Sequence, residues 1–551
     1  MVALLSAYMI WFYARKNVEW YTSTSVYIAW FFGFSIIILL PYDVYISYIV
    51  SDENNDSYIT MMEYIWRINW WIAFVLWYFV FPILGEYVTS GAFTVKGKLI
   101  YWVIQNLIFY AVMGLLGGIA LLYLWSKGQF DSENGSFSGF LIFWTNAYGL
   151  ILIILFLGYG VIAVPKKYYG MKQFSFKRKF VYFKVYNKEE TFHDKRFKLE
   201  ELAATALALK SKIKDRECIG YINIILDKWP QEFIEKAESF ASADYLDESD
   251  KGDEKSLISL NGKMKKAIED YERAHWSLRQ TLKEAIWLED IDNSEPNVFD
   301  SKVGGWLMEY KTYRVFSWYW ETKLNPIVSF ILFLITTTFS IIIVFGEVSI
   351  YLFKSSSSVI RDLFVNNFNN FFLTTVVIMV PLGYLWFCTF YGIFHIKLFG
   401  RYALNPNHHT DSFSLNLSAT LLTRLAPPLC YNFILLAKLE GTVFEKFMGE
   451  MEFIPVLGVS FQELFPILLV VLAIFNLLDV WSRLLRFVGF DSYTFVNKYD
   501  REKSEEGQTY VKSQRQKIES EIVDNARNAR WIIDSQGRNR DNFIELNSRS
   551  D

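Results

Sequence analysis

The chain has 551 residues, of which 52% are hydrophobic and 19% aromatic. Charged residues make up 21% and the formal net charge is −3, so the composition gives no indication of a nucleic-acid partner. The three cysteines, Cys218, Cys388 and Cys430, have neither zinc-site spacing nor that of a disulfide framework. We therefore expect no cofactor and no metal, and we expect charged and apolar residues to occupy different stretches of the chain.

Apolar stretches recur along the chain, and a membrane-spanning helix needs about 20 mostly apolar residues. The first stretch begins apolar and ends basic, the reverse of a cleavable signal peptide, so we count it as a span. The predicted fold class is all-α, a polytopic membrane helical bundle of about nine spans. These spans are 1–14, 25–50, 64–85, 99–125, 140–164, 325–346, 370–396, 414–437 and 462–487.

Basic residues alternate from loop to loop, and cytoplasmic loops carry the excess of Lys and Arg. Segment 51–57 has no basic residue, whereas 166–179 reads KKYYGMKQFSFKRK and has no acidic one. This pattern predicts an N-terminus outside and a C-terminus in the cytoplasm. Asn134 opens the sequence Asn134-Gly135-Ser136, a candidate glycosylation site on the outer side. Attraction of 166–179 to anionic lipid of the inner leaflet is its simplest interpretation.

A long polar insert separates the fifth span from the sixth and holds about half of the charged residues. Its stretches 197–226 and 256–289 have helical composition, which predicts a cytosolic helical hairpin resembling a coiled coil. The polar tail is expected to be largely disordered, with some helix around 508–534. The predicted domains are 1–165 (spans one to five), 166–324 (insert), 325–487 (spans six to nine) and 488–551 (cytosolic tail).

His408, His409 and Asp411 stand just before the eighth span, at its predicted cytoplasmic mouth. They could bind a metal, but two adjacent histidines without a third ligand nearby are a weak metal signal. Asp411 is also well placed to cap the helix that follows. We favour capping over a metal site, and a metal site over catalysis.

Arg424 lies about 15 Å inside the eighth span, where a charge is costly and normally has a partner. Pro427 and Pro428 follow at once and would interrupt the hydrogen-bond ladder. At a similar depth the ninth span carries Asp479, with Arg483 one turn away. We expect a structural ion pair of Arg424 with Asp479; a polar pathway or binding cavity is the alternative.

Pro41 and Asp43 interrupt the second apolar run, and Arg67 lies near the start of the third. The second span is predicted to run outward and the third inward, so Asp43 and Arg67 would meet at a similar depth near the outer face. We therefore expect them to form an ion pair that joins the two spans.

The chain resembles the limb-region (LMBR-like) membrane protein family, in particular its domain-containing-protein-2 branch. The resemblance covers nearly the whole chain to about residue 490, and the last of its motifs is long and unusual. The residues that carry it are ILLPYDV (38–44), WRINWW (66–71), SGAFTVKGK (90–98), LGYGVIAVPKKYY (157–169), EKSLISLNGKM (254–264), WLED (287–290), SWYWE (317–321) and HHTDSFSLNLSATLLTRLAPPLCYNF (408–433).

The resemblance implies nine spans, a large cytosolic loop and no catalytic residues. It also implies a role in regulating signalling near G-protein-coupled receptors for the branch that the chain resembles most, with lipocalin receptor function in another branch and lysosomal cobalamin export in a third. We expect a non-enzymatic receptor or regulator, in the plasma membrane rather than an endolysosomal one. The insert would then contact protein partners, including a signalling receptor. The alternatives are a transporter or lipid-handling protein with a path near Arg424, and an integral-membrane enzyme using His408, His409 and Asp411.

Overall fold

A computed structural model describes most of the chain, and its assigned elements are helices apart from an isolated bridge between Ala14 and Thr410. The chain divides into two compact units. The first comprises Met1–Lys167, Leu202–Lys266 and Phe333–Val496, and the second comprises Tyr168–Glu201, Ala267–Leu332 and Asn497–Asp551. The described residues are 1–49, 56–126, 137–213, 215–229, 231–238, 252–352, 371–395, 404–439, 441–449, 461–478, 480 and 500–547.

Seven helices are long and apolar enough to cross a membrane, which makes the chain a multi-pass membrane protein. Each coincides with one of the nine predicted spans. The other two predictions fall on shorter apolar helices, Val2–Tyr13 and Ile467–Leu477, so the count of nine stays a prediction. The seven spans are Trp20–Tyr48, Ser57–Thr89, Val95–Tyr123, Gly149–Met171, Lys311–Val348, Phe371–His395 and Ser412–Ala437.

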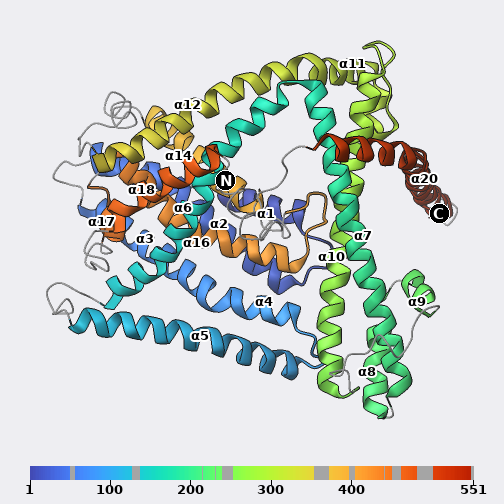
Figure 1. Cartoon of the computed structure of the whole chain (residues 1–551), viewed down its shortest axis with the longest axis horizontal. Coiled ribbons are helices and arrows are strands. Elements are labelled where there is room, and N and C mark those ends of the chain that lie inside the picture. Colours follow the sequence, from blue (N-terminus) through green and yellow to red (C-terminus); the bar gives the residue numbers. More distant parts are fainter. Residues whose placement is uncertain are drawn as a thin grey trace. The chain divides into compact units, whose positions relative to one another are not determined.

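The first unit is built around α16 (Ser412–Ala437), most of whose residues are buried. It packs against α2 (Trp20–Ile49), α4 (Phe81–Thr89) and α14 (Phe371–His395), beside which it lies in Figure 1. At the α2 crossing, a Cβ added at Gly33 would lie 2.8 Å from Leu422. The predicted interruption at Pro427 and Pro428 is not seen, because α16 continues through both prolines.

Glycines allow α6 (Phe137–Met171) to touch α14 backbone to backbone. A Cβ at Gly160 would lie 2.0 Å from the carbonyl oxygen of Cys388, and one at Gly392 would lie 2.4 Å from that of Phe156. The order of these two contacts makes the helices antiparallel. Close to these glycines, Ser340 of α12 (Asn325–Leu352) donates to the Val161 carbonyl at 2.7 Å.

Two π-helices precede prolines and join helices into long spans. η1 (Leu76–Val80) links α3 (Asp56–Val75) to α4, which begins Phe81-Pro82, and η4 (Trp320–Leu324) links α11 (Lys311–Tyr319) to α12, which begins Asn325-Pro326. Proline has no N–H, so a carbonyl of the preceding turn loses its donor. Near η1 the Tyr110 hydroxyl donates to the Tyr78 carbonyl instead.

The remaining helices of the first unit lie in the membrane-span regions and the insert. They are α1 (Val2–Tyr13), α5 (Val95–Ser126), α8 (Arg216–Leu226), α9 (Gln231–Glu238), α17 (Val443–Gly449) and α18 (Phe461–Leu477).

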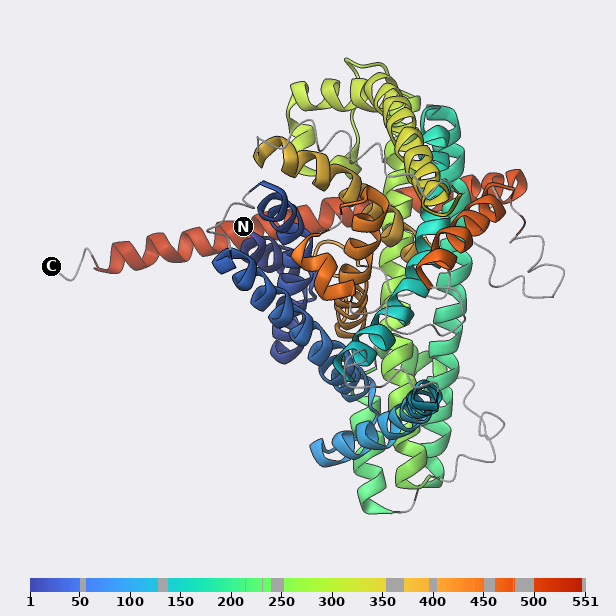
Figure 2. The same ribbon diagram turned by 90° about the vertical axis from the view of Figure 1, so that its left-hand side faces the viewer.

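The second unit is a helical body formed by α7 (Phe174–Lys212), α10 (Glu254–Asp292) and α20 (Arg501–Asn547). Its part of α7 runs antiparallel to its part of α10, and the two lie side by side in Figures 1 and 2. The 3-10 helix η3 (Lys302–Glu309) and α11 follow. The predicted helices of the insert are present, with α7 beginning well before residue 197.

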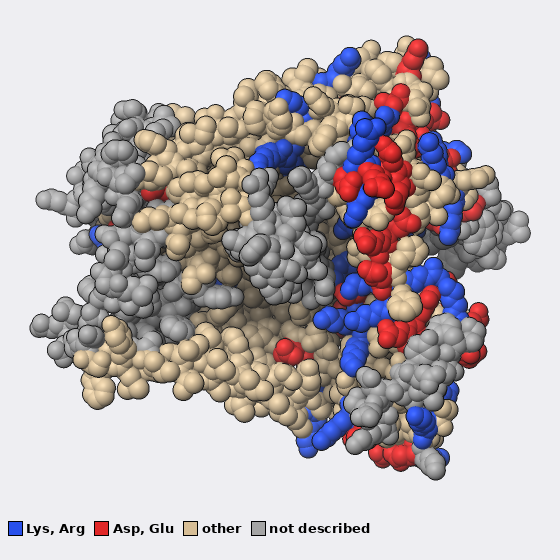
Figure 3. Space-filling model, viewed as in Figure 1, with Lys and Arg blue, Asp and Glu red and all other residues tan. Residues whose placement is uncertain are grey.

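The tail differs from the prediction, because 501–547 is helical rather than largely disordered. Its composition is polar, yet the few apolar residues of its first half recur at helical spacing and meet the apolar residues of α7 and α10. In Figure 3, charged side chains crowd over α7 and α10, whereas the surface over α4 and α5 is mainly uncharged.

Candidate functional site

Asp43 is fully buried in α2, where four donors surround its carboxylate. The N–H groups of Phe444 and Val443 donate at 2.7 and 3.3 Å, and Trp66 Nε1 and Ser47 Oγ donate at 3.2 Å each. Since Val443 and Phe444 begin α17, a carboxylate from another helix caps this one. The sequence correctly predicted that Asp43 lies inside the bundle, and in the structure its carboxylate holds the N-terminus of α17.

The predicted ion pair between Asp43 and Arg67 is wrong. Arg67 is exposed, and its neighbour Trp66, which is 2% exposed, takes the place facing Asp43. Depth along two spans predicts the helical turn at which residues meet, but adjacent residues project about 100° apart around a helix axis. Depth therefore could not decide which residue of that turn faces the acid.

Arg424 is buried in α16 and lies over the ring of Trp77, with Cζ 4.5 Å from the ring centroid. Trp77 belongs to the π-helix η1, and Gly149 of α6 lies close by. A Cβ at Gly149 would lie 3.2 Å from the Arg424 carbonyl oxygen and 3.7 Å from Cζ. Asp479 and Arg483 fall outside the described residues, so the pairing of Arg424 with Asp479 remains a prediction.

A second buried acid of the membrane unit, Glu347 of α12, was missed by the sequence reasoning. It is fully buried, and its Oε1 accepts a hydrogen bond of 3.1 Å from Nδ2 of Asn432 on α16. The signal was present as a single glutamate in an apolar run, but the predicted sixth span ended at 346, one residue before it. Asp43, Arg424 and Glu347 make their described contacts with different residues and form three separate groups.

His408 and His409 lie in a loop that packs against the end of α1. The His408 N–H donates to the Phe12 carbonyl at 3.0 Å, and its Nδ1 lies 3.2 Å from the Ala14 carbonyl oxygen. Asp411 caps α16 as predicted, since its carboxylate accepts from the Ser414 N–H at 3.0 Å. No group of three potential metal ligands occurs within the described residues. Asn134 falls outside them.

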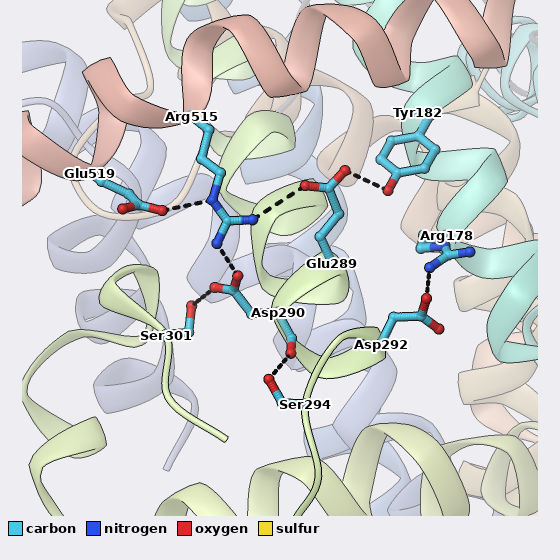
Figure 4. Close-up of polar contacts among 9 residues, drawn as sticks. All are labelled: Arg178, Tyr182, Glu289, Asp290, Asp292, Ser294, Ser301, Arg515 and Glu519. Atoms are coloured by element: carbon cyan, nitrogen blue, oxygen red, sulfur yellow. Dashed lines mark hydrogen bonds and ion pairs between the residues drawn. The ribbon is translucent and has the colours of Figure 1, made fainter. Parts of the chain in front are cut away.

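A polar cluster of the second unit surrounds Arg515 of α20 (Figure 4). Its guanidinium contacts Asp290 and Glu289 of α10, with 3.5 Å to Glu289 Oε2, and also Glu519 of its own helix at 2.8 Å. The Tyr182 hydroxyl of α7 donates to the other oxygen of Glu289 at 2.7 Å. One arginine thus joins the tail helix to two adjacent carboxylates of the insert.

Smaller contacts extend this cluster on both sides. Ser301 donates to the Asp290 carboxylate, and Arg178 of α7 pairs with Asp292 of α10. Lys302 binds Glu519 at 3.0 Å, and Arg279 of α10 binds Glu521 at 2.8 Å.

Within this cluster the pKa values of Tyr182 and Arg515 are raised, whereas that of Glu519 is lowered. Burial raises the pKa of Tyr182, and the hydrogen bond to Glu289 raises it further. Burial alone would lower the pKa of Arg515, but Asp290 and Glu519 outweigh it and raise that pKa. Burial opposes the ionisation of Glu519, yet Lys302 and Arg515 lower its pKa. Arg515 is therefore held as a cation facing carboxylates.

Apolar contacts lie beside this cluster. Val511 and Ile518 of α20 are buried against Val181 and Val185 of α7 and residues of α10. Gly507 lets α20 approach α7 closely, since a Cβ there would lie 2.1 Å from the Tyr182 carbonyl oxygen. The sequence signal was the helical spacing of these residues, which the polar composition of the tail obscured.

Comparison with known proteins confirms the resemblance seen in the sequence. The profile of the family described as "LMBR1-like membrane protein" matches residues 1–481. "LMBR1 domain-containing protein 2 homolog A" of Dictyostelium discoideum is 28% identical over 94% of this chain and 77% of its own length. Proteins named "G-protein coupled receptor-associated protein LMBRD2" from Xenopus laevis and Homo sapiens are 27% and 26% identical. They cover 83% and 87% of this chain and 67% and 72% of their own lengths. No solved structure matches.

Proposed function

We propose that this chain, which belongs to the LMBR1-like membrane protein family, associates with G-protein-coupled receptors and regulates their signalling. The observation that carries the proposal is its similarity, over most of its length, to relatives named for association with such receptors. In this proposal the chain is a regulator without catalytic activity, located in the plasma membrane. Its N-terminus is outside, and the insert and the C-terminus are in the cytoplasm.

The insert supports this proposal because it offers a cytosolic docking surface. Helices α7 and α10 of the second unit pack into an ordered body with α20, stabilised by an apolar cluster and by ion pairs. An ordered surface of this kind can bind a partner without first folding. The basic stretch 166–179 would hold this part of the chain near anionic lipid of the inner leaflet.

Complementation of split luciferase between the chain and a panel of G-protein-coupled receptors in living cells tests the proposal. We expect a subset of receptors to give a signal above that of an unrelated multi-pass protein at the same expression level. Removal of the chain should change the second-messenger response of that subset only. Equal signals for all receptors and for the unrelated protein would contradict the proposal.

A second candidate function is transport or lipid handling, favoured by the buried charged groups inside the spans. Arg424 and Glu347 both contact residues in the membrane unit, and intramembrane ionisable residues often mark pathways. Chemical labelling with a membrane-permeant, water-soluble reagent tests this candidate. Labelling near Arg424 and Glu347 that decreases when a substrate is added would support a pathway. Labelling that is the same with and without added lipids or solutes would favour the regulatory function.

A further inference from the structure

One face of α20 carries the residues through which its first half contacts the apolar cluster and the adjacent carboxylates of α10. Gly507, Val511 and Ile518 lie on this face together with Arg515, which stands four residues after Val511 and three before Ile518. Such spacings bring side chains together on one side of a helix. The opposite side of this half is polar, and Lys512 and Lys517 on it are exposed.

The receiving face of α7 and α10 requires a cation at the position of Arg515. The side chains of Glu289 and Asp290 are only 9% and 8% exposed, and they are adjacent in the chain. Tyr182 and Ser301 donate hydrogen bonds to them but carry no charge. A helix that covered this face without a cation would leave two adjacent, nearly buried carboxylates without a counter-charge, which disfavours its docking. Any helix that replaces α20 must therefore supply an equivalent guanidinium.

The remaining contacts of α20 suit an exchangeable helix. The ion pairs of Arg279 with Glu521 and of Lys302 with Glu519 join side chains that are partly exposed, and such pairs contribute little net stability. The apolar contacts are the buried Val511 and Ile518 and the partly buried Tyr510 and Ile522. The Ser504 hydroxyl also donates to the Lys179 carbonyl at 2.8 Å. These contacts form one short amphipathic surface, and tethering to the same chain raises the effective concentration of the helix that carries it.

We propose that α20 is an intramolecular ligand of a docking surface on α7 and α10. The partner that this surface fits is an amphipathic helix with an arginine, an aliphatic residue four positions before it and another three positions after it. It also needs a small residue eight positions before the arginine, where α20 has Gly507. The proposal rests on the proposed function, because it names the surface through which a signalling partner binds. Release of α20 precedes that binding.

Titration of a fluorescent peptide with the sequence of residues 501–524 against the full chain tests this. The chain variant Gly507→Leu prevents docking of α20 by a backbone clash and leaves the receiving face unchanged. We expect this variant to bind the peptide at least about tenfold more tightly than the unmodified chain. Arg515→Glu in the chain should do the same by a different route, which guards against misfolding of either variant. Equal binding by all three chains, or no binding by either variant, would overturn the proposal.

Peptide variants test the predicted recognition pattern. Arg515→Glu in the peptide should abolish binding to the Gly507→Leu chain, and Arg515→Lys should weaken it because an ammonium lacks the planar fork. Lys512→Glu makes the same change of charge on the exposed side and should have little effect. Equal losses from Arg515→Glu and Lys512→Glu would mean that general charge attraction, and not this surface, captures the peptide.

Receptor complementation separates the two proposals. If the surface serves receptors, the Gly507→Leu chain should give a stronger signal with the same subset of receptors than the unmodified chain. An unchanged signal, with peptide binding still increased, would refute receptor docking at this surface and leave receptor association intact. If no receptor gives a signal with any variant, the proposed function fails while the peptide result still stands.

Discussion

The membrane unit and the helical unit satisfy their buried acids in different ways. In the membrane unit, the described contacts of Asp43 and Glu347 are with neutral donors: backbone N–H groups, an indole, a hydroxyl and an amide. In the helical unit, Glu289 and Asp290 face a guanidinium. Neutral donors hold a helix in a fixed place, because each is directional and none can move without leaving a polar group unsatisfied. By contrast, a helix that binds through one partly exposed arginine can be replaced by another helix with an arginine at the same position.

Both units also use glycine to bring backbones together, which supplies the strongest test of the comparison. Gly160→Ala should destabilise the membrane unit by about 3 kcal/mol or more, because the new methyl group meets the rigid carbonyl of Cys388. Thermal unfolding of the purified protein in detergent measures this. Gly114 of α5 is the matched control, since a Cβ there meets nothing within 4 Å. Gly114→Ala should raise stability slightly through helix propensity, and equal effects at both sites would contradict the proposed contact.

Removal of the Asp43 carboxylate should have an effect of similar size. Asp43→Ala leaves the N–H groups of Val443 and Phe444 and the indole of Trp66 without an acceptor. At about 1–3 kcal/mol for each orphaned donor, with partial relaxation, we expect a loss on the order of 4 kcal/mol. Asp43→Asn keeps one acceptor oxygen and should lose less. Arg67→Ala, on an exposed side chain one residue from Trp66, should change stability by no more than about 0.5 kcal/mol. A larger loss from Arg67→Ala than from Asp43→Ala would restore the ion pair.

The Arg515 cluster should respond more weakly, because the arginine side chain is 35% exposed. We expect Arg515→Ala to destabilise docking of α20 by about 1–2 kcal/mol, below the cost of breaking a fully buried pair. Hydrogen exchange of residues 501–524 in the full chain measures this locally. A double-mutant cycle with Asp290→Asn should show a coupling of about 1 kcal/mol. Additive effects would mean that Arg515 acts elsewhere.

The same contrast explains what the sequence could and could not predict. Length and apolarity were enough to locate the seven spans, because a bilayer sets both. Local chemistry was enough for Asp411, whose cap lies within three residues along the chain. Contacts between distant residues were not predictable in this way. Asp43 binds residues about 400 positions away at the start of α17, and no local pattern encodes that distance.

The tail shows a second reason why contacts could not be predicted from the sequence. A glycine and a few apolar residues in a polar helix are weak evidence of structure when considered alone. They become decisive only when Tyr182 and the apolar residues of α10 supply the surface that they contact. Stability of this kind comes from tertiary packing rather than from helix propensity. The prediction missed Glu347 for a simpler reason, because the predicted sixth span ended one residue before it.

The smallest expected effect concerns the pH dependence of the contact between α10 and α20 in the helical unit. His275 of α10 is an exposed residue overall, but its imidazole ring packs beside the rings of Phe192 and Tyr271, with centroids 5.6 and 6.0 Å away. Burial lowers its pKa from the ordinary value of 6.5, and the charge of Arg279 lowers it further. Lys517 of α20 also lowers it, while Glu521 of α20 and Glu272 of α10 oppose the shift. The unfolded chain therefore takes up a proton at this position more readily than the folded unit.

Because the folded pKa is the lower one, the contribution of neutral His275 is fully present above pH 6.5. It is lost as the pH falls from 6.5 towards the folded pKa, so acidification should loosen the contact of α10 with α20. Hydrogen exchange of residues 501–524 at a series of pH values, corrected for the intrinsic exchange rate, measures this. His275→Gln keeps a neutral polar side chain and should abolish the change between pH 6.5 and 5.5, whereas the exposed His193 replaced by Gln should leave it intact. A change between pH 6.5 and 5.5 that survives His275→Gln would contradict this assignment to His275. Protonation of Glu519, whose pKa is lowered by Lys302 and Arg515, should weaken the docking of α20 only at more acidic pH.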